Sequence, residues 1–171
     1  MNINIRNVSI EDLDAVSEVE AKCFPEAEAA SKASFEKRIK TFPENFYVAE
    51  VEGKIIGLIN GCITNEKTIY DELFSDVSLH IPNGDYQAIF GLDVIPDYRN
   101  QGIAAQLMSH MIEASRAANR KGLILTCKEH MIDYYSKFGF NNKGISNSQH
   151  GGAVWYDMIL EFWYSLGVNI L

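Results

Sequence analysis

The sequence predicts one α/β domain built around a mixed β-sheet. Segments in which apolar and polar residues alternate, as in a half-buried strand, are interleaved with segments whose apolar residues recur every three or four positions, as on a helix face. Their order along the chain, β-α-α-β-β-β-α-β-α-β, is typical of a mixed sheet covered by helices. Because the 171 residues contain no internal repeat or Pro/Gly/Ser-rich linker, we expect a single domain over residues 1–171.

The N-terminal part of the chain predicts two helices and three strands. Asn2 to Asn7 alternates as a strand does, and Ser9 followed by Asp12 resembles a capping box that starts a helix running towards Ala21. The remaining elements predicted here are a helix over residues 31–40 and a hairpin with strands at 46–51 and 54–63.

The C-terminal part is dominated by a strand that leads into a long helix. Residues 86–94 predict the strand, which Pro96 ends because proline has no N–H to donate to a sheet, and residues 102–119 predict the helix. The other predicted elements are a short helix near 70–74, a buried strand at 123–127, one or two helical turns over 131–138 that end at Gly139, and a closing strand at 153–160.

Composition argues against several classes of partner. Hydrophobic residues make up 47% and charged residues 22%, as in ordinary globular proteins, and no apolar run is long enough to span a bilayer. The formal net charge of −8 argues against nucleic acid, whose phosphates require a basic face. We therefore expect neither a nucleic acid nor a membrane as partner, and an acidic surface favours cationic small molecules weakly.

The cysteines and histidines predict no metal centre. Cys23, Cys62 and Cys127 are odd in number and widely spaced, which indicates free thiols in a reducing cytoplasm. The four histidines are scattered without the spacing of metal ligands. The first residues do not form a secretory signal, so we expect a cytoplasmic location.

The most informative segment is Leu-Asp-Val-Ile-Pro-Asp-Tyr-Arg-Asn-Gln-Gly-Ile-Ala-Ala at residues 92–105. It runs from a strand through a tight turn into the long helix, whose first N–H groups lack partners and carry partial positive charge. Such a helix start binds phosphate without a lysine. Small residues from Gly102 onwards leave room for a pyrophosphate, and Arg99 adds a positive charge. An ordinary strand–turn–helix junction is the alternative, and the spacing matches neither common Gly-rich nucleotide loop.

Two blocks carry a resemblance to a known family. Arg99-Asn100-Gln101-Gly102-Ile103-Ala104 resembles the R/Q-x-x-G-x-G/A signature of the GNAT N-acetyltransferase superfamily, and Tyr135 to Phe140 resembles its Y-x-x-x-G-F segment. The resemblance implies the GNAT fold, a mostly antiparallel mixed sheet of roughly six or seven strands flanked by about four helices. It also implies acetyl-CoA as cosubstrate, with the pantetheine arm lying along the strand as a further strand would. The cofactor contacts it implies are Leu92, Asp93, Val94, Asn100, Gln101, Gly102, Ile103, Ala104 and Ala105.

A third block is similar to one branch of that superfamily. Residues 23–31, Cys-Phe-Pro-Glu-Ala-Glu-Ala-Ala-Ser, resemble the F-P-x-x-E-x-A-S loop of arylalkylamine and polyamine N-acetyltransferases. Ala88 and Phe90 stand where vertebrate serotonin enzymes carry two histidines, so a histidine relay is excluded at that place. The acidic loop residue of other relatives corresponds here to Glu28.

The resemblance implies roles for individual residues. Glu28 is expected to take the proton of the incoming amine, with a pKa raised by burial, and Tyr135 to protonate the departing thiolate. The N–H of Val94 is expected to stabilise the oxyanion of the tetrahedral intermediate. The alternatives are that Glu28 is a helix-cap or solvated carboxylate and that Tyr135 is a core aromatic. Asp93 is a second base, a cation anchor, or a hydrogen-bond acceptor for a loop backbone.

Three functions follow from these alternatives. The first is acetyl transfer from acetyl-CoA to the primary amine of a small molecule by direct attack in a ternary complex. The others are Nα-acetylation of a protein or peptide, and coenzyme A binding by a regulatory module without catalysis. The acidic patch of Asp71, Glu72 and Asp76 is either solvated or holds the distal ammonium of a polyamine. The apolar tail at residues 161–171 suits packing on its own domain or a homodimer contact.

Overall fold

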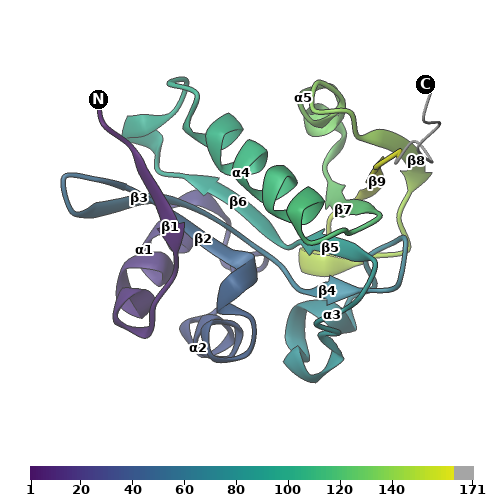
Figure 1. Cartoon of the computed structure of the whole chain (residues 1–171), viewed down its shortest axis with the longest axis horizontal. Helices are drawn as coiled ribbons and strands as arrows, with labels where there is room; N and C mark the ends of the chain where they lie inside the picture. Colours follow the sequence, from purple (N-terminus) through teal and green to yellow (C-terminus); the bar gives the residue numbers. More distant parts are fainter. Residues whose placement is uncertain (164–171) are drawn as a thin grey trace, which may run out of the picture.

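The computed structural model in Figure 1 describes residues 1–163 and confirms the mixed α/β architecture. Within these residues it has more strands than predicted. The strands are β1 (Asn4–Asn7), β2 (Phe46–Val51), β3 (Lys54–Asn60), β4 (Ile63–Thr64), β5 (Tyr86–Ile89), β6 (Gly91–Val94), β7 (Gly122–Cys127), β8 (Asn141–Ile145) and β9 (Tyr156–Glu161). The α-helices are α1 (Leu13–Cys23), α2 (Lys32–Thr41), α3 (Glu72–Ser75), α4 (Ile103–Ala117) and α5 (Ile132–Ser136).

The strands form two sheets, and strands from the middle of the chain contribute to both. The first sheet has the order β1-β2-β3-β6 and is antiparallel throughout. The second has the order β4-β5-β7-β9-β8, and β5 and β7 are its parallel pair. The chain passes directly from one sheet to the other twice, between β3 and β4 and between β5 and β6, and it returns to the second sheet through α4 between β6 and β7.

Both passages interrupt a strand that was predicted to be continuous. Residues 54–63 divide into β3 and β4 around Gly61, and residues 86–94 divide into β5 and β6 at Phe90. The two passages lie against each other, because a Cβ on Gly61 would be 1.7 Å from the carbonyl oxygen of Ala88. Apolar patterning did not reveal the interruptions, since the residues around Gly61 and those before Phe90 are buried.

Helices cover both faces of the first sheet (Figure 1). Gly57 of β3 pairs with Val94 of β6, and a Cβ on Gly57 would point at Val94 and at Leu107 of α4. The side chain of Asp93, the residue before Val94, lies instead beside Glu20 of α1. Because neighbouring residues of a strand point to opposite faces, α4 and α1 lie on opposite sides of β6. The residues fully buried in this core include Val16 and Phe35 from α1 and α2, and Leu107 and Met108 from α4.

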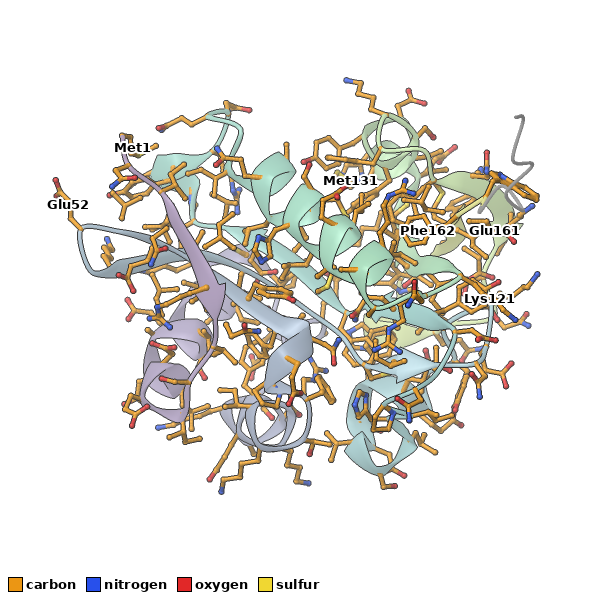
Figure 2. All side chains as sticks on the ribbon, in the orientation of Figure 1. Met1, Glu52, Lys121, Met131, Glu161 and Phe162 are labelled. Atoms are coloured by element: carbon orange, nitrogen blue, oxygen red, sulfur yellow. The ribbon has the colours of Figure 1, made fainter. Side chains whose placement is uncertain are left out.

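Local signals placed the helix starts well. The N–H of Ser9 donates to Asp12 Oδ2 at 2.8 Å, as the predicted capping box requires, and the hydroxyl of Ser31 accepts from the N–H of Ser34 at 3.1 Å. These side chains satisfy N–H groups that a helix start leaves unpaired. The hairpin of β2 and β3 turns at Glu52, which lies at its tip (Figure 2).

The end of the domain differs from the prediction. The strand β8 was missed because Asn-Asn-Lys-Gly-Ile is a mostly exposed edge strand without an apolar face. Phe162 is buried beneath the guanidinium of Arg116 at 4.2 Å, whereas Trp163 is 90% exposed. The rest of the apolar tail, residues 164–171, lies outside the described residues. Each helix within residues 1–163 falls short of the length and apolarity that a bilayer span requires.

We predict that Gly61→Ala will destabilise the fold through the crossing of the two passages. Its Cβ would overlap the Ala88 carbonyl, and relieving such overpacking costs about 2–3 kcal/mol of the free energy of unfolding. Gly53→Ala is the matched control, because Gly53 has a φ of 78° but nothing within 4 Å, so only backbone strain of about 1 kcal/mol is expected. Urea unfolding of the two variants measures the difference, and equal losses would contradict the close crossing.

Candidate active site

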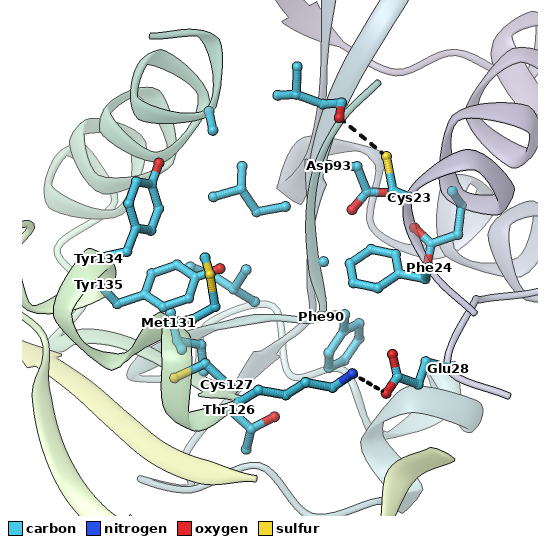
Figure 3. A pocket seen from close by; sticks show the side chains of 18 of the residues that line it. Cys23, Phe24, Glu28, Phe90, Asp93, Thr126, Cys127, Met131, Tyr134 and Tyr135 are labelled. Carbon is cyan, nitrogen blue, oxygen red and sulfur yellow. Dashed lines mark hydrogen bonds and ion pairs between the residues drawn. The ribbon is translucent and has the colours of Figure 1, made fainter. Parts of the chain in front are cut away.

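A cavity of about 690 Å³ opens where the two sheets part (Figure 3). Four stretches of chain and one residue of α3, Phe74, line it. The stretches are the end of α1 with the loop that follows, the end of β5 with β6 and the start of α4, the end of β7 with α5, and the loop before β9. These stretches hold almost every residue that the sequence singled out. Of the nine predicted cofactor contacts, all but Gln101 line the cavity, and Gln101 is exposed.

The cavity exists because β6 leaves the neighbourhood of β7. β5 pairs with β7, but β6 pairs with β3 and with no other strand among residues 1–163. Antiparallel partners alternate in the direction of their main-chain groups, and the N–H of Ile95 donates to Ile56 of the first sheet. The N–H groups of Leu92 and Val94 therefore point away from β3, along an open edge that faces the cavity.

This alternation separates the three residues predicted on the strand. Leu92 and Val94 offer main-chain groups to the open edge, as a pantetheine arm would need. The carbonyl of Val94 already accepts from Arg99 Nε at 2.8 Å and from Cys23 Sγ at 3.4 Å. The main chain of Asp93 is turned towards β3, so Asp93 reaches the cavity through its side chain.

The turn between β6 and α4 has the shape of an anion cradle. Asn100 and Gly102 have φ of 61° and 78°, and Gly102 is the N-cap of α4. The first bond of the helix runs from the N–H of Gln106 to the carbonyl of Gly102 at 3.1 Å, so the N–H groups of residues 103–105 have no acceptor within the helix. A Cβ on Gly102 would meet nothing within 4 Å, which leaves space for a diphosphate above these donors. The open edge and the cradle together fit coenzyme A.

Tyr135 enters the cavity from the opposite side. It projects from α5 towards β6 (Figure 3), and its half-buried ring packs edge-on against Tyr134 and Phe140. Burial raises the pKa of the Tyr135 phenol far above its ordinary value, and the neighbouring Cys127, Tyr134 and Asp93 raise it further. The phenol therefore stays protonated at neutral pH, as a proton donor must.

Glu28 lies at the mouth of the cavity, engaged by a residue that the sequence did not single out. Its side chain is 8% exposed, and its Oε1 is 2.6 Å from Nζ of Lys128 at the end of β7. His150 Nε2 lies 2.9 Å from the carbonyl oxygen of Glu28, and a Cβ on Gly151 would be 2.5 Å from the Glu28 side chain. The loop after α1 and the loop before β9 thus contact each other beside Glu28, whose side chain is drawn with its ion pair in Figure 3.

The acidic patch of the middle segment is used within the fold. Asp71 accepts from the hydroxyl of Ser148 and, at 3.0 Å, from the N–H of Gln149, so it holds the loop that carries His150. Asp76 accepts from the N–H of Ser78 at 3.0 Å and caps the short turn that follows α3. Both carboxylates therefore accept hydrogen bonds that stabilise loops of the fold.

The thiols near the cavity are poor nucleophiles. Burial raises the pKa of Cys127 to about 11 and that of Cys62 to about 12. The pKa of Cys23 is also raised by burial, although Arg99 opposes the effect. A thiolate is the reactive form of cysteine, and these three thiols hold their protons at neutral pH. Within residues 1–163 no three His, Cys, Asp or Glu side chains gather as metal ligands do.

Sequence reasoning missed the partner of Asp93. Glu20, on α1, is 6% exposed and lines the cavity beside Asp93, which is 1% exposed. Burial raises the pKa of Asp93 well above its ordinary value, and the facing carboxyl of Glu20 raises it further. Glu20 was predicted only as part of a helix, and no pattern in the sequence pairs it with a residue so far along the chain.

Comparisons with known proteins identify the family. The model of the acetyltransferase (GNAT) family matches residues 13–140. The chain is 27% identical over 128 residues to Probable hydrolase YhcX of Bacillus subtilis, an alignment covering 71% of this chain and 25% of that protein. It is 29% identical over 122 residues to Uncharacterized N-acetyltransferase YkwB of the same organism, covering 65% and 54%. The chain thus spans about half or less of the length of these relatives.

A solved structure shows the same fold. PaiA N-acetyltransferase from Thermoplasma acidophilum, in complex with coenzyme A, superimposes with a TM-score of 0.71 at 20% identity, over 95% of this chain and all of that one. The family match extends from the start of α1 to Phe140, and so covers the open edge of β6, the cradle and Tyr135. The chain belongs to the GNAT acetyltransferase family.

Proposed function

We propose that this protein transfers the acetyl group of acetyl-CoA to the primary amine of a small molecule. The observation that carries the proposal is the cavity itself, which joins a coenzyme A cradle to an acceptor end that two loops narrow. The cradle and the open edge would hold the diphosphate and the pantetheine arm, and acetyl-CoA supplies the acyl thioester. Aromatic side chains, among them Phe24, Phe90 and Trp155, line the acceptor end together with carboxyl groups.

The narrowed mouth favours a small acceptor over a peptide. A peptide substrate needs a groove that stays open at both ends, whereas here the loop after α1 and the loop before β9 contact each other across the mouth. The contacts are the Glu28–Lys128 ion pair, the His150–Glu28 hydrogen bond and the close approach of Gly151 to Glu28. Nα-acetylation of a peptide remains the second candidate, supported by the tyrosines that flank the cavity on the α5 side.

The geometry supports direct attack without an acyl-enzyme. An acyl-enzyme route would require a reactive nucleophile at the thioester, and the buried cysteines keep their protons. Tyr135 is proposed to protonate the thiolate as the carbon–sulfur bond breaks, and the N–H of Val94 on the open edge to stabilise the oxyanion. The cavity offers two acceptors for the proton of the amine, Glu28 at the mouth and Asp93 beside Glu20.

The proposed function predicts turnover of acetyl-CoA with small amines. Consumption of acetyl-CoA is measured against a panel of arylalkylamines, polyamines, aminoglycosides and short peptides. We expect turnover with an arylalkylamine or a polyamine and little with peptides, because the contacts between the two loops narrow the mouth. Turnover confined to peptides would favour the second candidate. Coenzyme A binding without turnover of any amine would favour the third function, a regulatory module that binds coenzyme A without catalysis.

Removing the phenol of Tyr135 should slow the chemical step. We predict that Tyr135→Phe lowers kcat by about 100-fold, the usual contribution of one general acid, while the Kd for acetyl-CoA stays within about threefold. Tyr134→Phe is the matched control, because Tyr134 lies one residue away on the same helix and lines the same cavity. Steady-state kinetics and calorimetry measure both quantities, and an unchanged kcat in Tyr135→Phe would remove the acid role.

A further inference from the structure

A buried polar cluster lies behind Gly91, against the floor of the cavity. It consists of Glu20 from α1, Arg38 from α2, Asn60 from the end of β3, and Asp93 from β6. Their exposed fractions are 6%, 5%, 1% and 1%. Polar groups buried this deeply normally have hydrogen-bond partners, since an unpaired one costs about 1–3 kcal/mol.

Part of the cluster is satisfied within the fold. Glu20 Oε1 accepts from the N–H of Ala30 at 3.0 Å, and Arg38 donates to Asn60 Oδ1 at 3.0 Å and to the carbonyl of Phe74 at 2.9 Å. Burial lowers the pKa of Arg38 to about 10, and Glu20 opposes that change. These bonds hold the cluster rigid from the side away from the cavity.

The atoms that face the cavity are not satisfied. Among residues 1–163, Asn60 Nδ2 and both carboxyl oxygens of Asp93 are buried without a hydrogen-bond partner when the carboxyls are ionised. The group opposite Asp93 is the carboxyl of Glu20, and two carboxyls can bond to each other only if one of them holds a proton. An arrangement of this kind accommodates a donor that can reach both acids.

Gly91 provides the opening for such a donor. A Cβ at Gly91 would lie 3.2 Å from Asp93 Oδ1, 3.6 Å from Asn60 Nδ2 and 3.8 Å from the second oxygen of Glu20, Oε2. The polar atoms therefore converge on the space that a side chain at Gly91 would occupy, and Gly91, Glu20 and Asp93 all line the cavity. That space is the size of a methyl group, and an ammonium group is of similar size.

The same place is where the thioester should arrive. The diphosphate would lie at the start of α4, and the pantetheine arm would run back along the open edge from Val94 to Leu92. The residue before Leu92 is Gly91, so the acyl end would come to rest beside the converging oxygens. Glu28, by contrast, lies at the mouth and already has the ammonium of Lys128 as its counterion.

We propose that the Glu20–Asp93 carboxyl pair is the seat of the acceptor's ammonium group and takes the proton that the amine must lose. This inference rests on the proposed function, and it assigns the acceptor as a primary amine bound as a cation. The resting pair shares one proton. That proton leaves to water when the ammonium binds, because the cation replaces it between the two carboxylates.

Asp93 and Tyr135 accept and supply the protons that the reaction moves. The ammonium gives one proton to Asp93, and the nitrogen lone pair forms the carbon–nitrogen bond to the thioester carbonyl. The carbon–sulfur bond breaks as the tetrahedral intermediate collapses, and the thiolate takes the Tyr135 proton. The nitrogen returns its second proton to the tyrosinate, so the products are the amide, free coenzyme A thiol and protonated Asp93, which releases its proton to water.

The groups around Asp93 decide the pH dependence. Burial raises its pKa first, Glu20 and Cys23 from α1 raise it further, and Arg38 from α2 lowers it. Across the cavity, Tyr135 of α5 stays protonated. For the wild type, kcat/KM should therefore fall as the pH drops through the raised pKa of the pair, because the pair then keeps the proton that the ammonium must displace.

The test is the pH profile of kcat/KM with an amine that the wild type acetylates, for Asp93→Asn, Glu20→Gln and Glu28→Gln. We expect Asp93→Asn to lose about 100-fold in kcat/KM and to lose the acidic limb, because the carboxyl that takes the proton is gone. Glu20→Gln should move the limb to lower pH, since Glu20 no longer raises the pKa of Asp93, and Glu28→Gln should keep the limb at the wild-type pH. A wild-type profile in Asp93→Asn, or loss of the limb in Glu28→Gln, would overturn the assignment.

A second variant tests the seat without touching the carboxyls. Gly91→Ala places a methyl group where the ammonium would lie, so KM for the amine should rise about tenfold or more while the Kd for acetyl-CoA, measured by calorimetry, stays within about threefold. An unchanged KM would refute the seat even if Asp93→Asn fails to fold. If the wild type acetylates none of the amines tested, the proposed function fails. If the wild type acetylates an amine and the variants are unaffected, only the carboxyl seat is refuted.

Discussion

The structure depends on one departure from regular pairing, in which β6 stays with β3 while β5 stays with β7. A strand of a sheet normally has partners on both sides, and an unpaired edge exposes N–H and C=O groups that attract another strand. Here the edge faces inward, into a cavity, and ends at the start of a long helix. An extended arm with a diphosphate at one end is the kind of ligand that such an edge and such a helix start bind together.

The departure also determines where charge is tolerated. Asp93 points to the α1 side of β6 and meets Glu20, while Leu92 and Val94 keep their N–H groups for the open edge. Arg38 and Asn60 hold this side of the site by hydrogen bonds, and Gly91 leaves it open to the cavity. At the mouth, Glu28 is balanced by Lys128. Glu20 and Asp93, which form no direct ion pair within residues 1–163, lie deep in the cavity, where a bound cation is shielded from water and its interaction with a carboxylate is strong.

Features that reside in a short stretch of sequence were predictable. The strand, turn and helix of residues 92–105, with small residues after Arg99, predicted the anion cradle. Ser9 and Ser31 predicted helix starts through local capping. A short motif also singled out Tyr135, which lines the cavity. Apolar periodicity also placed β2, β3 and β7, although it could not show that the strands break at Gly61 and Phe90, because the residues around Gly61 and those before Phe90 are buried.

Features that depend on residues distant in the sequence were not predictable. Lys128 is a hundred positions from Glu28, and Asp93 is more than seventy from Glu20, so neither pair leaves a pattern along the chain. Lys128 at the end of β7 makes Glu28 half of an ion pair, and the residues around Glu28 in the sequence do not show this. The edge strand β8 lacks an apolar face, which removes the signal by which strands are recognised.

The open edge of β6 can be examined amide by amide. Hydrogen exchange measured by NMR, with and without coenzyme A, should show the Leu92 and Val94 amides and those of the first turn of α4 becoming protected when the ligand binds. The Ile95 amide, which already donates to Ile56, should be protected in both states. Coenzyme A binding by calorimetry that leaves Leu92 and Val94 exchanging as in the free protein would contradict the account.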